Sequence, residues 1–331
     1  MYTIAIDAMG GDYAPDITVQ GSVSALRAFG DLRVLLVGQA ERIELLLGGA
    51  EDVRDRLTVV DAREVIENTE SPVMGIRKKT DSSLVRAYGL VREGEAQALV
   101  SAGSTGAVMA GGMFRLGRVP GVERPALATL LPTLGQNPAL LVDVGANVDC
   151  LPEYLLSFAR MGHTYMRQVV NIDAPRVALL NIGEEAEKGN QLTKGAFELL
   201  KASGLNFIGN LEARGIPMGE TDIIVADGFA GNIVLKSMEG ISKAIFTLLK
   251  RELMATKRAK LGALLAKDAF GSVKKNLDAD EVGGAPLLGV EGAVIKAHGN
   301  SNAHAFFCAI RQARRMLEGD VVGIIRREAN Q

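Results

Sequence analysis

The stretch Ala98-Leu-Val-Ser-Ala-Gly-Ser-Thr-Gly106 shows how this chain is built. A short apolar run, Ala98–Ser101, ends in a glycine turn, and a segment of helical period, Thr105–Leu116, follows directly. Continuous apolar strands that alternate with helices are typical of a parallel sheet covered on both faces. The stretch therefore predicts one strand–turn–helix unit of an α/β fold.

The same alternation continues along the whole chain. The expected strands are Thr3–Asp7, Arg33–Val37, Leu57–Asp61, Ala98–Ser101, Ala126–Leu131, Leu140–Val144, Val177–Asn181, Asn206–Ile208 and Ile223–Ala226. The expected helices are Pro15–Phe29, Ala40–Leu47, Ser82–Arg92, Thr105–Leu116, Glu153–Gln168, Asn190–Ala202, Asn232–Met254 and Ala303–Leu317. We expect a mostly parallel sheet, with right-handed crossovers that place the strand-to-helix loops along one edge.

Length and composition limit the class of protein. The 331 residues are 47% hydrophobic and include 37 basic and 39 acidic side chains. This apolar fraction supplies a sizeable core, which excludes a disordered chain and a disulfide-stapled miniprotein. A net charge of −2 gives no overall basic field, so we expect no nucleic-acid partner. The chain has no Pro/Ser-rich linker, and we expect a single large unit over residues 1–331.

The cysteines, the histidines and the N-terminus indicate the compartment. Cys150 and Cys308 form no CxxC motif, which favours a reduced, intracellular protein. The three histidines lack metal-ligand spacing, so we expect no metal site. The N-terminus has no signal-peptide pattern. Two uncharged stretches, Ala96–Phe114 and Pro125–Val142, are interrupted by glycine or proline, so we expect a soluble protein.

One segment, residues 232–275, differs from the rest and predicts a protruding helical hairpin. Between Lys250 and Lys275 it carries eight basic and two acidic residues, a net charge of +6. Its apolar residues step by three and four, as on one face of a helix. The residues expected to contact a membrane are Lys257, Lys260, Leu261, Leu264 and Leu265. A solvated charged face on a dimer helix explains the pattern equally well as contact with an anionic membrane surface or an acidic protein.

Five glycine-containing loops follow expected strands and are candidates for holding an anion. They are Asp7–Asp12, Ser101–Gly106, Asp143–Asn147, Asn181–Glu185 and Asp227–Asn232. Glycine lets backbone approach a ligand closely, and the following helix directs N–H groups at it, which suits phosphate. The residues expected to bind phosphate or substrate are Gly10, Gly11, Gly103, Ser104, Thr105, Gly106, Asp227 and Gly228. For any single loop, an ordinary Ser, Thr or Asp helix cap is the simpler reading.

Known nucleotide and hydrolase signatures are absent from the sequence. There is no GxG triplet, no GxxxxGK[ST] loop and no GxSxG elbow, so an NAD, ATP or serine-hydrolase site of those types is not expected. Lys188, Lys236 and Lys296 follow or adjoin the loops and could pair with phosphate, although each alone is typical of a surface lysine. His298 lies in a loop after the apolar run Gly292–Ile295, where a catalytic or a structural histidine fits.

Eight motifs in order along nearly the whole chain resemble the PlsX family of phosphate acyltransferases. They are Ile6-Asp-Ala-Met-Gly-Gly-Asp-Tyr-Ala-Pro15, Ser101-Ala-Gly-Ser-Thr-Gly-Ala107, Arg124-Pro-Ala-Leu-Ala128, Asp143-Val-Gly-Ala-Asn147, Asn181-Ile-Gly-Glu-Glu-Ala-Glu-Lys-Gly189, Asn210-Leu-Glu212, Asp227-Gly-Phe-Ala-Gly-Asn232 and Lys296-Ala-His-Gly299. One departure is Ser104, where the family often has Asn. The resemblance implies a three-layer α/β/α fold similar to phosphotransacetylase and isocitrate/isopropylmalate dehydrogenases, and a homodimer.

The resemblance also implies a reaction and its partners. A long-chain acyl group would move from acyl carrier protein to inorganic phosphate, and the acyl-phosphate would pass to the membrane acyltransferase PlsY. The protein would be cytoplasmic with peripheral attachment to an anionic membrane. Two other readings stay open, namely a dehydrogenase on the related fold and a non-enzymatic scaffold that gathers carrier protein and membrane enzyme.

The residue inventory suits direct attack by phosphate on a thioester. Phosphate is already anionic and a thiol leaves readily, so positioning and oxyanion stabilisation are the remaining tasks, with no metal, cofactor or covalent intermediate. We expect phosphate on the Ser101–Gly106 loop beside a lysine such as Lys188. The expected catalytic residues are His298, Asn232, Asn181 and Lys188.

Overall fold

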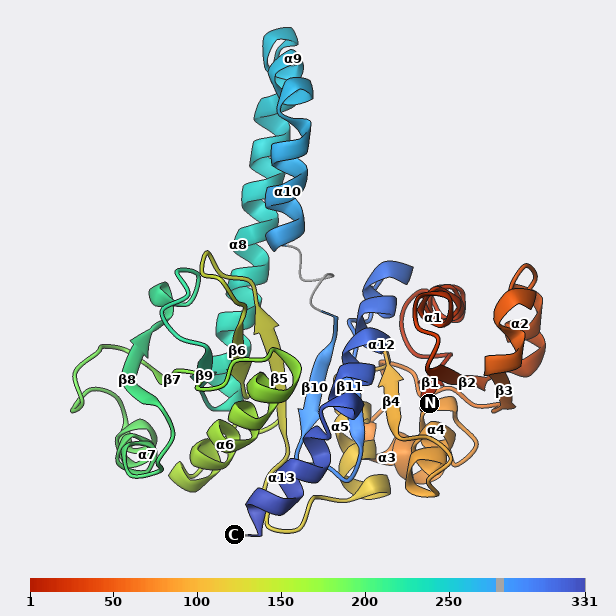
Figure 1. The fold of residues 1–331 in the computed structure, drawn as a ribbon, viewed down its shortest axis with the longest axis horizontal. Helices are drawn as coiled ribbons and strands as arrows, with labels where there is room; N and C mark the ends of the chain where they lie inside the picture. Colours follow the sequence, from red (N-terminus) through yellow and green to blue (C-terminus); the bar gives the residue numbers. More distant parts are fainter. Residues whose placement is uncertain (278–282, 331) are drawn as a thin grey trace.

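An 11-stranded sheet runs through the molecule in this computed structural model, which describes residues 1–277 and 283–330 (Figure 1). The strand order is β3-β2-β1-β4-β11-β10-β5-β6-β9-β7-β8. The strands are β1 Tyr2–Asp7, β2 Leu32–Gly38, β3 Leu57–Asp61, β4 Ala98–Ser101, β5 Ala126–Leu131, β6 Ala139–Val142, β7 Val177–Asn181, β8 Phe207–Glu212, β9 Ile223–Val225, β10 Ala285–Leu288 and β11 Ala293–Lys296. All nine expected strands are present, and β10 and β11 are additional.

The sheet changes direction at its centre. The ladders among β3, β2, β1, β4 and β11 are parallel, and so are those among β6, β9, β7 and β8. Between the two groups, three ladders are antiparallel, β11 with β10, β10 with β5, and β5 with β6. The two parallel groups therefore run in opposite directions. A mostly parallel sheet is confirmed, but the expectation that all strand-to-helix loops share one edge is wrong.

Helices cover both faces of the sheet and give the expected three layers. They are α1 Asp16–Ala28, α2 Ala40–Leu46, α3 Pro72–Lys78, α4 Ser83–Arg92, α5 Thr105–Gly111, α6 Pro152–Val169, α7 Gln191–Lys201, α8 Gly228–Ala255, α9 Lys257–Leu265, α10 Lys267–Leu277, α12 Ala303–Glu318 and α13 Val321–Ala329. Short 3-10 turns, η1 Glu51–Arg56 and η3 Ala213–Gly215, and a π-helical turn, η2 Gly112–Leu116, complete the set. The expected helix Thr105–Leu116 thus divides into α5 and η2.

Two hydrophobic cores lie on opposite faces of the sheet. Because side chains alternate along a strand, Ile4 and Ile6 of β1 enter one core and Ala5 enters the other. The first core is completed by α1, α6, α7, α12 and α13, and the second by α3, α4 and α5, with the start of α8 packed against it. Both cores are continuous along the sheet, so the parallel groups are held together at its centre.

A helical hairpin protrudes from the sheet, as expected, with α8 as one arm and α9 and α10 as the other (Figure 1). It spans residues 228–277 and so begins earlier than the predicted 232–275. Near its start, α8 packs Val234, Leu235 and Met238 against the second core. Thr256 separates α8 from α9 and caps α9 by accepting a hydrogen bond from the Ala259 N–H at 3.1 Å.

Within residues 1–277 and 283–330, none of the helices combines the length and the apolar character needed to cross a bilayer.

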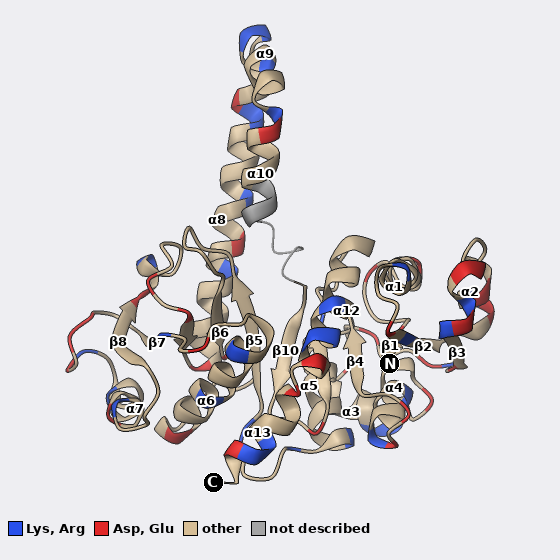
Figure 2. Ribbon diagram, in the orientation of Figure 1, with Lys and Arg blue, Asp and Glu red and all other residues tan. Residues whose placement is uncertain are grey.

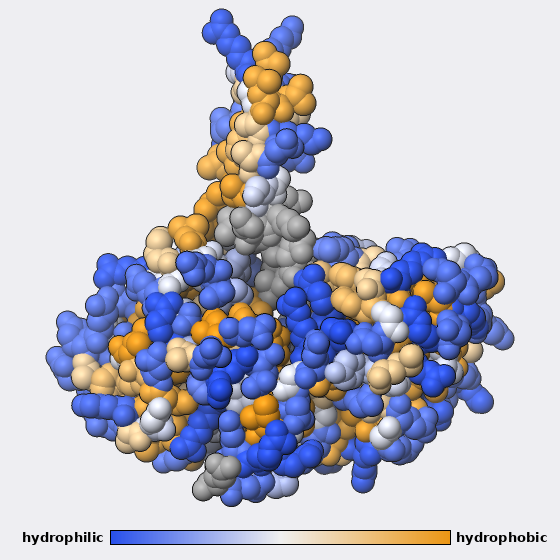
Figure 3. Space-filling model, viewed as in Figure 1, coloured by the Kyte–Doolittle hydropathy of each residue, from blue (hydrophilic) through white to orange (hydrophobic). Residues whose placement is uncertain are grey.

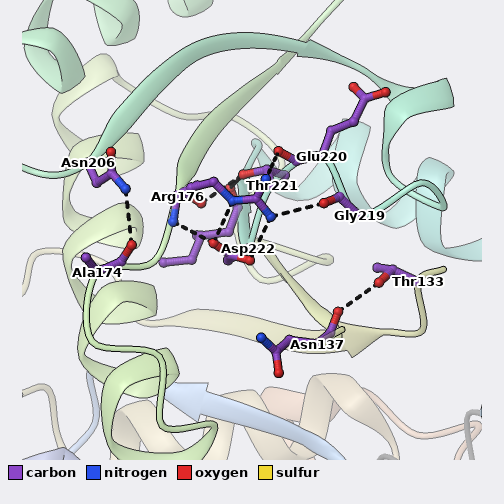
Figure 4. A network of polar contacts seen from close by, with 10 residues as sticks. Thr133, Asn137, Ala174, Arg176, Asn206, Gly219, Glu220, Thr221 and Asp222 are labelled. Carbon is purple, nitrogen blue, oxygen red and sulfur yellow. Dashed lines mark hydrogen bonds and ion pairs between the residues drawn. The ribbon is translucent and has the colours of Figure 1, made fainter. Parts of the chain in front are cut away.

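An ion pair fixes the amino-terminal ends of β7 and β9 (Figure 4). Asp222 precedes β9 and accepts hydrogen bonds from the Arg176 side chain at 3.0 Å, from both Nε and Nη2, and from the Arg176 backbone N–H at 2.8 Å. Arg176 Nη1 also donates to the Glu220 carbonyl at 2.7 Å. Asp222 is buried while the Arg176 side chain is 43% exposed, so removing the Asp222 carboxylate alone would leave the Arg176 donors without their shared acceptor.

Replacing Asp222 with alanine leaves the Arg176 side chain and N–H without their shared acceptor. We expect Asp222→Ala to lower the free energy of unfolding by about 1–3 kcal/mol, the usual range for leaving such groups unsatisfied. Chemical denaturation followed by circular dichroism measures this. Asp55→Ala removes an exposed carboxylate from η1 and should change stability by less than about 0.5 kcal/mol, so equal effects of both variants contradict this role for Asp222.

Candidate active site

Asp7 organises the first group of loops, at the carboxyl end of β1. Its buried carboxylate accepts hydrogen bonds from the Ser83 and Ser101 hydroxyls, both at 2.6 Å. Burial raises the pKa of Asp7, and the bonds from Ser101 and Ser83 partly offset the effect. The Ser101 oxygen in turn accepts from the Gly103 N–H at 3.0 Å. Asp7 therefore fixes the Ser101–Gly106 turn, and its oxygens are already engaged by these donors.

Glycines allow three loops to meet around Asp7. A Cβ on Gly10 would lie 2.4 Å from Asp7 Oδ2 and 2.7 Å from the Gly103 nitrogen. Gly11 has a φ of +105° and packs against Ala102 and Gly299. The Asp12 N–H donates to the Gly299 carbonyl at 2.8 Å. The loops that end β1, β4 and β11 are thus joined backbone to backbone, with His298 in the third of them.

Lys296 ends β11 at this meeting point and is buried, with 8% of its surface exposed. In the ladder between β4 and β11 it lies opposite Ser101. Burial, followed by the charge of Lys236 on α8, lowers the pKa of Lys296 to about 8, while Asp12 and Asp7 act in the opposite direction. The reading of Lys296 as a typical surface lysine is therefore wrong.

A second group of loops surrounds Asp143, after β6. One carboxylate oxygen accepts from the N–H groups of Gly145 at 3.2 Å and Ala146 at 3.0 Å, and the other from the Asn147 N–H at 2.6 Å. Burial raises the pKa of Asp143, and the hydrogen bonds from Ala146 and Asn147 partly offset the effect. The loop Asp143–Asn147 therefore binds its own carboxylate, which corrects the expectation that its donors are available to an external anion.

The start of α8 packs onto that loop. Asp227 caps the helix by accepting from the Ala230 N–H at 2.8 Å, and the Gly228 N–H donates to the Asn147 carbonyl at 2.7 Å. Asn232 follows on the first turns of the helix, is exposed and lies next to Gly145. Asp227 therefore acts as a helix cap, which is the simpler of the two interpretations that the sequence allows for it.

Asn181 and Lys188 border another turn of this second group, after β7. The Asn181 side chain accepts from the Ile182 N–H at 2.8 Å and donates to the Lys188 carbonyl at 3.2 Å, so it closes the turn. The Lys188 side chain is exposed. A cavity of about 500 Å³ lies beside this turn, lined by Asn181, Thr193, Asp227 and mostly apolar side chains of β7, α6 and α8. A larger hollow of about 1170 Å³, between the β5–β6 turn, α6 and α12, contains none of the expected site residues.

The expected site residues fall into these two groups. Gly10, Gly11, Gly103, Ser104, Thr105, Gly106 and His298 belong to the first, and Asn181, Lys188, Asp227, Gly228 and Asn232 belong to the second. Between β4 and β7 the sheet order leaves six inter-strand steps, roughly 29 Å at ~4.8 Å per step. The expectation that Lys188 lies beside the Ser101–Gly106 loop of the same chain is therefore wrong.

Helix α8 links the two groups. Asn232 and Lys236 are four residues apart and so share one face of the helix. Lys236 is close enough to Lys296 for its charge to affect the Lys296 pKa. The sequence does not reveal that Ser83 binds Asp7, that Asp12 is tied to Gly299, or that Lys296 is buried. The available signal was the apolar run before Lys296, which marks a buried strand ending in a lysine.

In residues 1–277 and 283–330, no group of three or more His, Cys, Asp or Glu side chains has the arrangement needed for a metal ion. Cys150 is half-buried, and burial raises the pKa of its thiol to about 11. Cys308 is fully buried. The Cys150 thiol therefore lacks the lowered pKa of a cysteine nucleophile, and Cys308 is out of reach of solvent.

Known proteins resemble this chain over nearly its full length. The sequence profile of the family described as fatty acid synthesis protein matches residues 2–323. A phosphate acyltransferase from Geobacillus thermodenitrificans is 50% identical over 325 residues, 98% of each chain. Among solved structures, a phosphotransacetylase from Streptococcus pyogenes superposes with a TM-score of 0.63 at 17% identity, covering 96% of this chain and 94% of that one.

A further structure from Salmonella typhimurium, assigned as a 4-hydroxythreonine-4-phosphate dehydrogenase, superposes with a TM-score of 0.51 at 15% identity over 96% of this chain and all of that one. At such low identity both superpositions inform the fold alone. They confirm the expected three-layer α/β architecture, which transacetylase and dehydrogenase folds share.

The close approach at Gly10 gives a direct test of the first group of loops. We expect Gly10→Ala to lower the free energy of unfolding by at least about 1–3 kcal/mol, because the new methyl group must displace the Asp7 carboxylate or the Gly103 backbone. Thermal and chemical unfolding measure the change. Gly30→Ala is the matched control, since nothing lies within 4 Å of the added atom. A Gly10→Ala protein as stable as the control contradicts the packing described.

Proposed function

Because the chain belongs to the PlsX family of fatty acid synthesis proteins, we propose that it transfers a long-chain fatty acyl group from acyl carrier protein to inorganic phosphate. The protein is an acyltransferase, and the observation that carries this conclusion is 50% identity to phosphate acyltransferases across nearly the whole chain. We propose three further points: acyl carrier protein is the donor, acyl-phosphate is the product, and the product passes to PlsY.

The chemistry proposed is direct attack by a phosphate oxygen on the thioester carbonyl. The new bond forms between that oxygen and the acyl carbon, and the carbon–sulfur bond breaks with its electron pair on the thiolate, which then takes up a proton. Preset donors stabilise the tetrahedral oxyanion between these events. The two cysteines support this route over a covalent one, because both are buried to some degree and the Cys150 pKa is raised to about 11.

Among the residues expected to act, we propose His298 and Asn232 as the groups that polarise the carbonyl or assist the leaving thiolate. His298 lies in the loop tied to Asp12 through Gly299, and Asn232 shares a helix face with Lys236. Asn181 and Lys188 border the turn after β7, so a role for them requires the acyl donor to reach the second group of loops.

A chemical trap tests the reaction. Acyl-acyl carrier protein and inorganic phosphate with the protein should yield an acyl-phosphate that hydroxylamine converts to a hydroxamate, dependent on both substrates. The same mixture with a nicotinamide cofactor should show no substrate-dependent change in absorbance. Hydroxylamine also cleaves thioesters directly, so the readout is the increase in hydroxamate that requires both the protein and phosphate. No such increase contradicts the proposal, and nicotinamide reduction would favour a dehydrogenase. If neither product forms, a scaffold is the better description.

We further propose that the hairpin tip attaches the protein to an anionic membrane. Lys and Arg gather around α9 at the tip (Figure 2), and apolar surface continues along the hairpin (Figure 3). Leu261, Leu264 and Leu265 are exposed by 60%, 68% and 82%. Lysines that meet anionic lipid while leucines enter the interface would give weak, reversible binding. Because acyl carrier protein is acidic, the same lysines are also suited to bind it.

The shaft of the hairpin supports the proposed homodimer. Ile241, Ile245 and Leu248 step by four and three along α8, and each is at least half exposed. They lie between the part of α8 that packs on the sheet and the tip. A second copy of the chain that packs on this stripe would bury it.

The lipid contact predicts the behaviour of a triple variant. We expect Leu261→Glu/Leu264→Glu/Leu265→Glu to lower the fraction bound to anionic vesicles at least about tenfold, because full burial of a single leucine is worth about 1.5–3 kcal/mol. Co-sedimentation with phosphatidylglycerol vesicles measures binding. Leu45→Glu replaces a leucine of α2 that is 84% exposed and should bind as the unmodified protein does. Unchanged binding by the triple variant contradicts attachment through the tip.

A further inference from the structure

Lys296 is an unusual cation in this molecule. Among residues 1–277 and 283–330 it is the one lysine or arginine buried to this depth, with 8% exposure. Its ammonium donates a hydrogen bond to the adjacent Ala297 carbonyl. In the same part of the chain no carboxylate forms an ion pair with it. A buried ammonium without a paired anion is unfavourable in a low-dielectric site, so the position calls for a negative partner.

Lys296 lies beside loops of small and polar residues. Ser101 lies opposite Lys296 in the ladder and is bonded to Asp7, which holds the turn into Gly103. Gly10, Gly11 and Gly299 pack backbone against backbone in the neighbouring loops. Gly10 is buried, whereas Gly11 and Gly299 are partly exposed, and neither carries a Cβ that would keep a ligand from the main chain.

A second lysine, Lys236, comes from the helix that follows β9, in the other parallel group of the sheet. Lys236 lies two turns into α8, and its charge acts directly on Lys296. Lys236 is exposed and paired with Glu239 at 2.8 Å, and an exposed ion pair of this kind is weak enough to be exchanged for a bound anion. Two positive charges held near each other repel, and an anion between them relieves the repulsion.

We propose that Lys296 and Lys236 together bind the phosphate dianion that attacks the acyl donor. This inference rests on the proposed function and adds residues to it: the phosphate site is formed by β11 and α8, and Lys188 is not part of it. Phosphate carries two negative charges in the slightly alkaline range, which matches two ammonium groups better than one. The clamp also joins the two parallel groups of the sheet, because each contributes one lysine.

Phosphate binding without any acyl donor is the first test. Calorimetry with inorganic phosphate should show a dissociation constant that rises roughly ten- to a hundred-fold in Lys296→Met and in Lys236→Met, the range expected for one charge-assisted contact. The KM for phosphate should rise by the same factor. Lys201→Met removes an exposed lysine at the end of α7 and should leave both values unchanged.

Proton uptake provides a readout that a purely structural lysine would not change. The Lys296 pKa of about 8 is below its usual value of 10.5 and should rise when a dianion binds. Above pH 8, where the free lysine is largely neutral, binding should therefore take up as much as one proton, and affinity should weaken as pH increases. Calorimetry at pH 8.5 in buffers of different ionisation enthalpy measures this. The other titratable groups around the site are Asp7, Asp12, Lys236, Glu239 and His298, and Lys296→Met leaves all of them in place.

The outcomes separate this inference from the proposed function. If hydroxamate forms and both methionine variants bind phosphate normally, the clamp is wrong and the acyltransfer stands. If the unmodified protein binds phosphate through both lysines but forms no acyl-phosphate, the site stands and the proposed reaction fails.

Circular dichroism checks that Lys296→Met is folded. Lys236→Met replaces an exposed side chain, so it tests the two-lysine site even if the Lys296→Met protein is unstable. If Lys296→Met still takes up a proton when phosphate binds, the proton does not go to Lys296 and that part of the inference is wrong.

Discussion

The three antiparallel ladders at the centre of the sheet determine at which end of the sheet the loops after the described strands lie. β10 and β5 reverse the direction of the sheet, so the strands on one side end where those on the other side begin. Loops that follow β1, β4 and β11 gather at one end, and loops that follow β6, β7 and β9 gather at the other. Helix α8 connects the two groups of loops. It starts after β9, packs on the second core and carries Lys236, whose charge lowers the pKa of Lys296.

Two buried carboxylates play parallel parts in the two groups of loops. Asp7 holds Ser83 and Ser101, and Asp143 holds three consecutive backbone N–H groups and the Asn147 side chain. In both cases the loop is shaped by an internal anion that belongs to the chain. A glycine-rich turn after a strand is therefore not in itself a vacant phosphate site, because an aspartate at the strand end can take its donors. What distinguishes the first group is the addition of a buried cation.

The sequence was informative where the physical signal is local. Apolar runs predicted nine strands, because buried parallel strands read as continuous hydrophobic segments, and the spacing of Val234 to Leu248 predicted the hairpin. β10 was missed because its four residues include a proline and are too few to show a period. The sequence could not show that the candidate site residues fall into two groups, because this depends on which strands run in opposite directions. Lys188 and Lys296 look alike as isolated lysines, and only the ladder with β4 shows that the second is enclosed.

Helix α8 is a single rigid rod of 28 residues, with Lys236 near its foot and Ala255 at its far end. At 1.5 Å per residue these two are about 28 Å apart, so a lipid surface that bound the hairpin tip as proposed would lie at least that far from Lys236. The proposed product, a long-chain acyl-phosphate formed near Lys236, would have to cover that distance before it reached the bilayer. Ile241, Ile245 and Leu248 lie along this interval, where the proposed second copy of the chain would cover them, so the acyl chain would cross most of it without contact with this stripe.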